Sequence, residues 1–193
     1  MTAFLIIFIS AAFTDNMLLS RFLGMCSVIG LSKKSDTAIG LGAAVTFVTA
    51  ITAALNYLVY NKILLPLGLG YLSFITFIIV IAATVQFIEM VIERISPSLY
   101  ATLGIFLPLI TVNCAILGVS LFMLNKPYAF VESFLFGLGG GAGWMFAIML
   151  ISAIRERINE QAVPKGLEGP GITLIIIGIM ALAFIGFSGM IRA

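Results

Sequence analysis

The chain lacks histidine and contains few charged residues, and these two absences exclude several classes of protein. Only 9% of its 193 residues are charged and 62% are hydrophobic, whereas soluble domains carry about 25% charged residues. This composition cannot build a water-facing surface, so a cytosolic enzyme is excluded. Without histidine there is no histidine acid/base chemistry and no histidine ligation of metal or haem, which leaves Cys26 and Cys114 as the only thiol ligands.

Several functional motifs are also missing. The net charge of +2 is dispersed along the chain, so there is no basic stripe for nucleic acid. No P-loop and no bacterial ferredoxin cysteine run are present. Residues 137–142 formally satisfy a dinucleotide-binding glycine pattern, but they open a hydrophobic stretch. We interpret the pairs Gly137/Gly141 and Gly139/Gly143 as small residues that allow close helix packing, and the lone Trp144 as a packing or interface residue.

Long uncharged apolar runs predict an all-α integral membrane protein. A membrane-spanning helix needs about 20 consecutive apolar residues. Six stretches reach that length, roughly 3–25, 38–60, 71–92, 99–124, 131–154 and 172–191. The first lacks a basic n-region and is therefore interpreted as a retained span. We expect one membrane domain over residues 1–193.

The distribution of basic residues predicts the orientation. The connections after the odd-numbered spans carry Lys33, Lys34, Arg94, Arg155, Arg157 and Lys165. The opposite side carries Lys62, Lys126 and Arg192. Six basic residues thus follow the odd-numbered spans, and three lie on the opposite side. By the positive-inside rule, the odd-numbered connections are therefore cytoplasmic. Both termini are then expected on the outer side of the inner (cytoplasmic) membrane.

Polar residues interrupt the first and fourth stretches. The first holds Thr14, Asp15, Asn16, Ser20, Arg21 and Gly24, and the fourth holds Pro108, Thr111 and Asn113 before Cys114. Pro108 removes a backbone donor and favours a break in its helix. Interrupted helices at membrane depth usually line a binding site or pathway. Asp15 is a candidate cation-binding or relay group, since a carboxylate is costly in that position.

The two halves of the chain resemble each other. Residues 26–32 read CSVIGLS and residues 114–120 read CAILGVS, and Gly-Leu-Gly and Ile-Thr matches follow in the same order. Because each half, about 1–97 and 98–193, contains three spans, the repeats must be inverted with respect to each other. Equivalent points of inverted repeats meet near the bilayer centre. The pattern therefore predicts that Cys26 and Cys114 approach each other there.

Three roles remain open for the two cysteines on these grounds: inert packing, a disulfide, or metal ligation. An iron–sulfur cluster generally takes four thiolates, so a cluster site requires a second chain. A secondary transporter without metal fits inverted repeats and Asp15 equally well. The charged groups Glu89, Glu93 and Arg94, and Arg155 to Arg157, are either solvated helix ends or a docking or ion-handling surface.

Six segments carry a family resemblance: RFLGMC (21–26), SKK (32–34), QFIEM (86–90), LGIFLPLITVNCA (103–115), AIRER (153–157) and GFSG (186–189). They resemble the family of the Rnf complex A and E subunits and the Na⁺-translocating NADH:quinone reductase D and E subunits. The similarity covers nearly the whole chain. Arg21 and the short connection 61–70 favour the Rnf A type, while Met25 and residues 111–113 also match the quinone-reductase E type.

The resemblance implies a six-span subunit of an electron-transfer chain that couples ferredoxin and NAD⁺ to Na⁺ or H⁺ transport. It implies that Cys26 and Cys114 supply half the ligands of an intramembrane [2Fe-2S] cluster. A paralogous Rnf E-type subunit supplies the other two cysteines. Flavins and further clusters are then expected on other subunits of the complex (B, C, D and G), with no complete active site in this chain.

Overall fold

The computed structural model describes residues 2–32, 35–95, 107–126, 128–158, 163–164, 166–167 and 169–186. All regular secondary structure in these ranges is helical, which confirms the predicted all-α class. The α-helices are α1 (Thr2–Ile9), α2 (Met25–Leu31), α3 (Ser35–Val59), α4 (Ser73–Ile95), α6 (Leu107–Thr111), α7 (Cys114–Leu124), α8 (Phe130–Arg157) and α9 (Pro170–Ile185). Short π-helical turns extend α1 over Ser10–Thr14 and α3 over Tyr60–Leu64, and a 3₁₀ turn, Gly70–Leu72, precedes α4.

Three of the described helices are long and apolar enough to cross a membrane, namely Ser35–Leu64, Gly70–Val91 and Phe130–Arg157. Three shorter apolar helices, of 10–17 residues, cover Phe4–Thr14, Pro108–Leu124 and Pro170–Ile185. The six predicted stretches thus correspond to three full-length helices and three shorter ones. The first and fourth stretches are interrupted, as predicted from their polar residues, and the chain is a multi-pass membrane protein.

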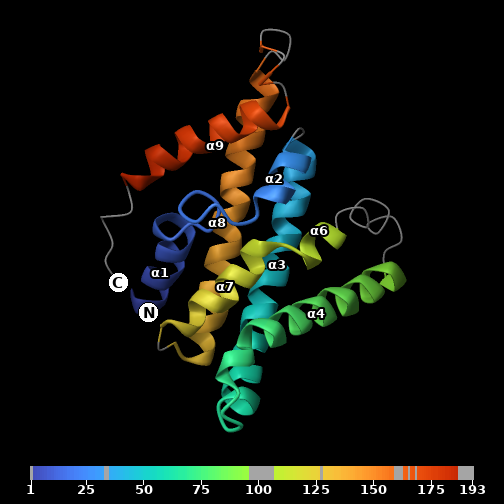
Figure 1. The fold of residues 1–193 in the computed structure, drawn as a ribbon, viewed down its shortest axis with the longest axis vertical. Coiled ribbons are helices and arrows are strands. Elements are labelled where there is room, and N and C mark those ends of the chain that lie inside the picture. The colour runs from blue at the N-terminus through green and yellow to red at the C-terminus, as the bar shows by residue number, and fades with distance from the viewer. Residues whose placement is uncertain are drawn as a thin grey trace.

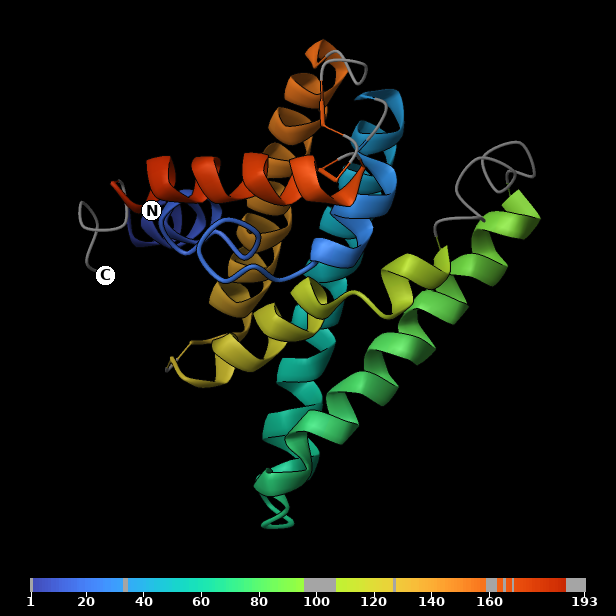
Figure 2. The ribbon, with the colours of Figure 1, turned by 45° about the horizontal axis from the view of Figure 1, so that its top comes forward.

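Helices α3 and α8 lie side by side and antiparallel at the centre of the fold (Figures 1 and 2). Glycines on α8 allow the close approach: a Cβ added at Gly137 would lie 2.6 Å from Ala53 Cβ, and one at Gly141 would lie 2.6 Å from Thr46 Cα. At the end of the pair, the Ser35 N–H donates to the Glu156 carboxylate at 2.6 Å.

A second glycine face of α8 packs against the first span. A Cβ at Gly139 would lie 2.8 Å from the Phe8 carbonyl oxygen, and one at Gly143 would lie 2.7 Å from Ala12 Cα. Both predicted pairs of packing glycines are therefore confirmed. Each pair leaves room for a different neighbour, so α8 is held between α3 and α1.

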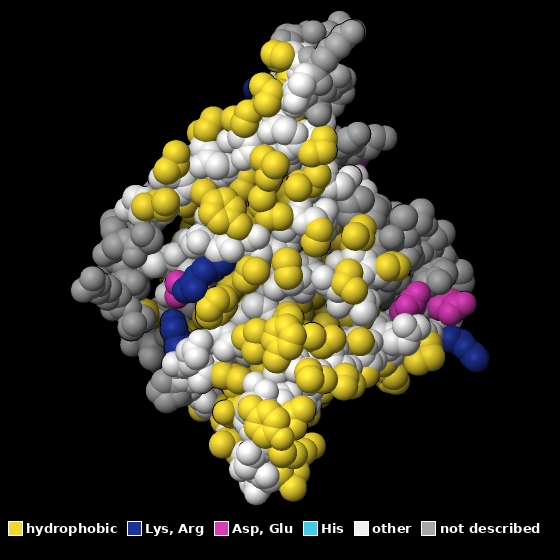
Figure 3. All heavy atoms as spheres, viewed as in Figure 1, with side chains coloured by type: hydrophobic (Ala, Val, Ile, Leu, Met, Phe, Trp, Pro, Cys, Tyr) yellow, Lys and Arg dark blue, Asp and Glu magenta, His cyan; other side chains and the backbone are white. Residues whose placement is uncertain are grey.

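Helices α4 and α9 extend to opposite sides of the α3/α8 pair (Figures 1 and 2). Their outward faces are apolar: Ile79 on α4 is 62% exposed and Leu182 on α9 is 72% exposed. Hydrophobic side chains dominate the surface in Figure 3 as well. Such a surface is stable against lipid or against an apolar face of a neighbouring protein, but not against water.

The two ends of the α3/α8 pair differ in their residues. Tyr57 lies near the end of α3 and Tyr128 precedes α8, and the Tyr57 ring is 6.0 Å from the Phe130 ring. Tyrosine is enriched at membrane–water interfaces. At the other end, Arg155 of α8 donates to Ser32 Oγ at 2.7 Å. The end of α2 and the end of α8 therefore lie together at this end of the helix pair.

Candidate functional site

The break in the first span is organised by Asn16, whose side chain is fully buried. Its amide nitrogen donates to the carbonyls of Ala12 at 2.9 Å and Gly143 at 2.8 Å. Its amide oxygen accepts from the backbone N–H groups of Leu18 at 3.0 Å and Leu19 at 3.2 Å. Asn16 thus replaces helical hydrogen bonds after Thr14 and ties the irregular segment 15–24 to α8.

This segment ends at Gly24, where α2 begins one residue before Cys26. Gly24 has φ +83° and Phe22 has φ +56°. A left-handed conformation is unfavourable for residues with a Cβ, so glycine suits the turn into α2. The Ser27 hydroxyl donates to the Gly24 carbonyl at 3.1 Å and closes the turn.

The break in the fourth span lies at residues 112–113. Pro108 occupies the first turn of α6, where its missing N–H has no helical partner to lose. What precedes α6 lies outside the described residues, so the predicted break at Pro108 itself is not tested. Asn113 caps α7 by accepting from the Ala115 N–H at 3.0 Å, and Cys114 is the first residue of that helix.

The two cysteine segments contact each other directly. The Gly24 N–H donates to Cys114 Sγ at 2.9 Å, and Asn113 Nδ2 donates to Ser27 Oγ at 3.5 Å. A side-chain atom built on Gly24 would also meet the Trp144 indole. Trp144 lies at the middle of α8, which has 28 residues and a length of about 42 Å. The two segments therefore meet halfway along the central helix pair.

The two thiols differ in exposure. Both are free, with Cys26 exposed and Cys114 partly buried. Cys114 borders a cavity of about 290 Å³ that Ile78, Ile81 and Ala82 of α4 also line. Among the described residues, no three His, Cys, Asp or Glu side chains lie together in a way that holds a metal ion.

An unpaired hydrogen-bond donor lies beside Gly24. Trp144 is 1% exposed, and its indole nitrogen has no partner in the part of the chain that the structure describes. A buried donor without an acceptor costs about 1–3 kcal/mol. The sequence indicates only a packing or interface role for Trp144, because nothing local shows that its ring nitrogen lies next to Gly24.

This environment fits a thiolate-ligated iron–sulfur group. A thiolate and its cluster carry negative charge and accept hydrogen bonds, and backbone N–H groups stabilise them. The Gly24 N–H already donates to Cys114 Sγ. Cys114 is also the first residue of α7, so it lies directly after the break in the fourth span. The exposed Cys26 leaves one side of the site open.

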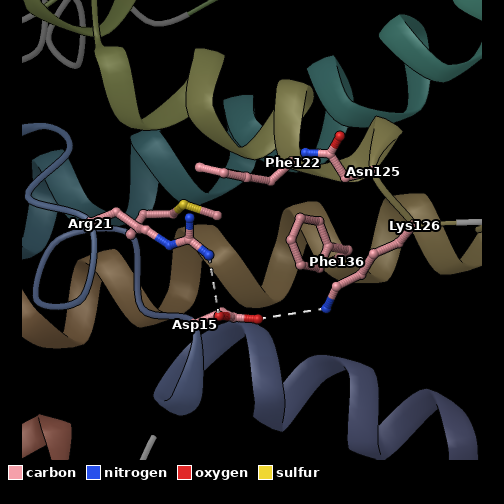
Figure 4. Close-up of a pocket in the computed structure, with 7 residues that line it drawn as sticks. Asp15, Arg21, Phe122, Asn125, Lys126 and Phe136 are labelled. Carbon is pink, nitrogen blue, oxygen red and sulfur yellow. Dashed lines mark ion pairs between the residues drawn. The ribbon is translucent and has the colours of Figure 1, made fainter. Parts of the chain in front are cut away.

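Asp15, the candidate cation-binding carboxylate, lies in a different place. Its oxygens are 3.8 Å from the Arg21 guanidinium and 3.6 Å from Lys126 Nζ (Figure 4). Two tethered cations thus face the carboxylate, and a free cation would have to displace them. The sequence did not indicate Lys126 as a partner, because it lies 111 residues away in the chain.

The charged helix ends divide into two kinds. Glu93 and Arg94 at the end of α4 are exposed, as a solvated end or a docking surface would be. Arg155 and Glu156 instead make structural contacts: Arg155 donates to Ser32 Oγ, and Glu156 accepts from the Ser35 N–H. These two residues connect the end of α8 to α2 and α3.

Comparison with known proteins gives a consistent picture. A family model described as "Rnf-Nqr subunit, membrane protein" matches residues 4–191. The A subunit of the Na⁺-translocating ferredoxin:NAD⁺ oxidoreductase complex of Acetobacterium woodii is 54% identical over 184 residues, which cover 95% of this chain and 96% of that protein. The E subunit of the Na⁺-translocating NADH-quinone reductase is 52% identical over 196 residues in Serratia proteamaculans, covering 98% of this chain and 99% of that protein. The corresponding protein of Photorhabdus laumondii is 51% identical with the same coverage.

Proposed function

The chain belongs to the Rnf-Nqr family of membrane subunits, and on that basis we propose that it is the A subunit of a Na⁺-translocating ferredoxin:NAD⁺ oxidoreductase complex. The observation that carries this proposal is the 54% identity to the Acetobacterium woodii protein over nearly the whole of both chains. The chain is part of a redox-driven ion translocase, in which other subunits hold the flavins and bind ferredoxin and NAD⁺.

A second candidate is the E subunit of the Na⁺-translocating NADH-quinone reductase, because relatives of that type reach 52% identity. The two assignments differ in electron donor and acceptor. Membranes of a strain that lacks its own copy of this chain, complemented with this chain, should recover ferredoxin-dependent NAD⁺ reduction. Recovery of NADH-dependent quinone reduction alone would favour the second candidate.

Within the complex, Cys26 and Cys114 are two of the four ligands of a [2Fe-2S] cluster, and a paralogous E-type subunit supplies the other two. Three observations support this: the two cysteine segments contact each other, the Gly24 N–H donates to Cys114 Sγ, and Cys26 is exposed. When bound, the cluster accepts and passes on single electrons. The chain's own role is to hold two thiolates halfway through the membrane and to surround them with donors.

The fold is one membrane domain made of two inverted repeats, about 1–97 and 98–193. The equivalent helices α3 and α8 pack against each other, and the equivalent helices α4 and α9 extend to opposite sides. The helices that carry the cysteines, α2 and α7, each begin directly after a break. This arrangement supports a pseudo-two-fold axis that passes near the two thiols.

The protein lies in the inner (cytoplasmic) membrane, with both termini outside, and contacts Rnf subunits of types B, C, D, E and G. The exposed apolar faces of α4 and α9 provide surface for these neighbours and for lipid. The connections after the odd-numbered spans, including the end of α8 at Arg155, lie on the cytoplasmic side.

The cysteine assignment is tested by Cys26→Ser and Cys114→Ser in the complete complex. Serine is a harder and much less acidic ligand than thiolate, so each variant should lose or strongly shift the cluster's electron paramagnetic resonance signal. Ala82→Ser is the matched control, since it introduces the same side chain into the cavity beside Cys114 and removes no thiol. If the two cysteines bind no metal, as in a secondary transporter, both variants should keep every cluster signal of the wild-type complex and full function.

A further inference from the structure

A second cavity, separate from the cysteines, lies between the break in the first span and the end of α7. It has a volume of about 270 Å³. Its wall is made of Asp15, Met17, Arg21, Phe122, Asn125, Lys126 and Phe136 (Figure 4). The cavity thus combines three charged groups and an amide with apolar and aromatic side chains, and the proposed electron transfer uses none of them.

The cavity carries an excess of positive charge. Arg21 and Lys126 share the single carboxylate of Asp15, at 3.8 Å and 3.6 Å. Both distances exceed those of a direct hydrogen bond, so neither cation is fully neutralised. The net charge of the three groups is +1, and their side chains are 34–45% exposed. An unbalanced charge of this kind in an apolar setting favours an anionic ligand and disfavours a cation.

Aromatic rings hold the two basic groups in position. The Arg21 guanidinium carbon lies 4.3 Å from the centre of the Phe122 ring. Lys126 Nζ lies 5.6 Å from the Phe136 ring and 5.7 Å from the Tyr128 ring. Such cation–π contacts restrict a long side chain without removing its charge. In Figure 4 both basic groups point toward Asp15, and the cavity lies among them.

The position of the cavity along the helix pair indicates which anion can reach it. Lys126 and Tyr128 lie in the connection before α8, at the tyrosine-rich end of the molecule. In Figure 3, a small group of basic and acidic side chains lies on a face that is otherwise mostly hydrophobic. Lys126 lies at the end of the cavity nearest this connection, where lipid phosphate groups are within reach, and basic pockets between membrane helices bind anionic headgroups.

We propose that this cavity binds a phosphate group, supplied by the headgroup of an anionic glycerophospholipid. The phosphate oxygens accept hydrogen bonds from Arg21 and Lys126, and the excess positive charge selects a headgroup with a net negative charge. Asp15 acts as an internal competitor for the same two cations. The lipid chains lie against the exposed apolar surface beside the cavity.

Because Asp15 competes with the phosphate for Arg21 and Lys126, substitutions of Asp15 and of the two basic residues should have opposite effects on lipid binding. Arg21→Gln with Lys126→Gln removes both positive charges, and should weaken binding about tenfold or more, because charge-assisted hydrogen bonds contribute at least that much affinity. Asp15→Asn raises the net charge of the cavity from +1 to +2 and should strengthen binding. Lys62→Gln removes an exposed lysine at the same end but outside the cavity and should change nothing.

The test uses the purified, delipidated complex. Bound lipid is counted by native mass spectrometry after titration with phosphatidylglycerol or with zwitterionic phosphatidylcholine, and the thermal midpoint is measured with phosphatidylglycerol or inorganic phosphate. We expect one phosphatidylglycerol retained in preference to phosphatidylcholine, lost in the Arg21/Lys126 double variant and held more tightly in Asp15→Asn. Equal stabilisation by inorganic phosphate would overturn the lipid assignment and identify a free phosphate as the source.

Two further results would overturn the proposal. One is an unchanged preference for phosphatidylglycerol in the double variant, which would place lipid binding elsewhere. The other is weaker binding in Asp15→Asn, which would show that Asp15 helps the ligand and is not its competitor. Neither result bears on the cysteines, whose cluster signal is measured on the same preparations.

Discussion

Asn16 should be one of the most sensitive positions outside the cysteines. In Asn16→Ala, the buried N–H groups of Leu18 and Leu19 lose their only acceptor in the described structure, and the Gly143 carbonyl loses the bond that ties the segment to α8. Each buried donor left without a partner costs about 1–3 kcal/mol. The two orphaned N–H groups alone should therefore destabilise the variant by about 2–6 kcal/mol.

Asn16→Asp separates hydrogen bonding from size. Aspartate has nearly the same shape and keeps the acceptor for Leu18 and Leu19, but it loses the donor to Ala12 and Gly143 and places a carboxylate against their carbonyls. We expect it to be at least as unstable as the alanine variant, since burying an unpaired charge is costly. Asn61→Ala is the control, because Asn61 makes one exposed bond to the Tyr57 carbonyl.

The assay is the thermal midpoint of the purified complex at one fixed heating rate. A loss of about 3 kcal/mol corresponds to a fall of about 6 °C or more for a chain of this size, while Asn61→Ala should lie within about 2 °C of wild type. The cluster signal should decrease together with stability, because the segment that Asn16 holds leads directly to Cys26. If Asn16→Ala and Asn61→Ala melt at the same temperature, Asn16 does not organise the break.

The remaining predictions concern the donor beside the cluster, the helix packing and the orientation. Trp144→Phe keeps an aromatic ring and removes the unpaired N–H, so the reduction potential of the cluster, measured by redox titration, should become more negative; an unchanged potential would make Trp144 a packing residue only. Gly141→Val should disrupt the contact between α3 and α8 and lower the yield of assembled complex, whereas Gly178→Ala, in open space, should assemble normally; equal yields would argue against the glycine contact. Cysteines engineered at Lys126 and Lys165 should react with impermeant thiol reagents from the outside and the cytoplasm respectively, and labelling of both from one side would refute the orientation.

Patterns within one stretch of chain predicted much of the fold. Helix length, apolar runs and the glycine spacing of residues 137–143 depend on local sequence, and the structure confirms the helices and both glycine faces. The interruptions were also predictable, because Asp15 and Asn16 cannot remain in a lipid-facing helix. The length of the first helix was overestimated, since apolar residues continue past Thr14, where the helix ends.

The contacts that build the site could not be predicted in the same way. Asn16 bonds a carbonyl 127 residues away, and Gly24 bonds a sulfur 90 residues away. Only the repeat indicated that Cys26 and Cys114 approach each other, and repeats relate backbone positions but not individual donors. The unpaired indole of Trp144 and the pairing of Lys126 with Asp15 depend on how side chains from different helices meet.

The most direct test of the shared cluster is a count of iron and acid-labile sulfide in two preparations, the isolated chain and the chain co-expressed with its paralogous partner. Two thiolates are half of the four that a [2Fe-2S] cluster takes, so the isolated chain should hold little or no defined cluster. The co-purified pair should contain about two iron and two sulfide per pair, with one reducible paramagnetic species. A full complement of iron and sulfide in the isolated monomer, or none in the assembled pair, would contradict the assignment of Cys26 and Cys114 to a shared site.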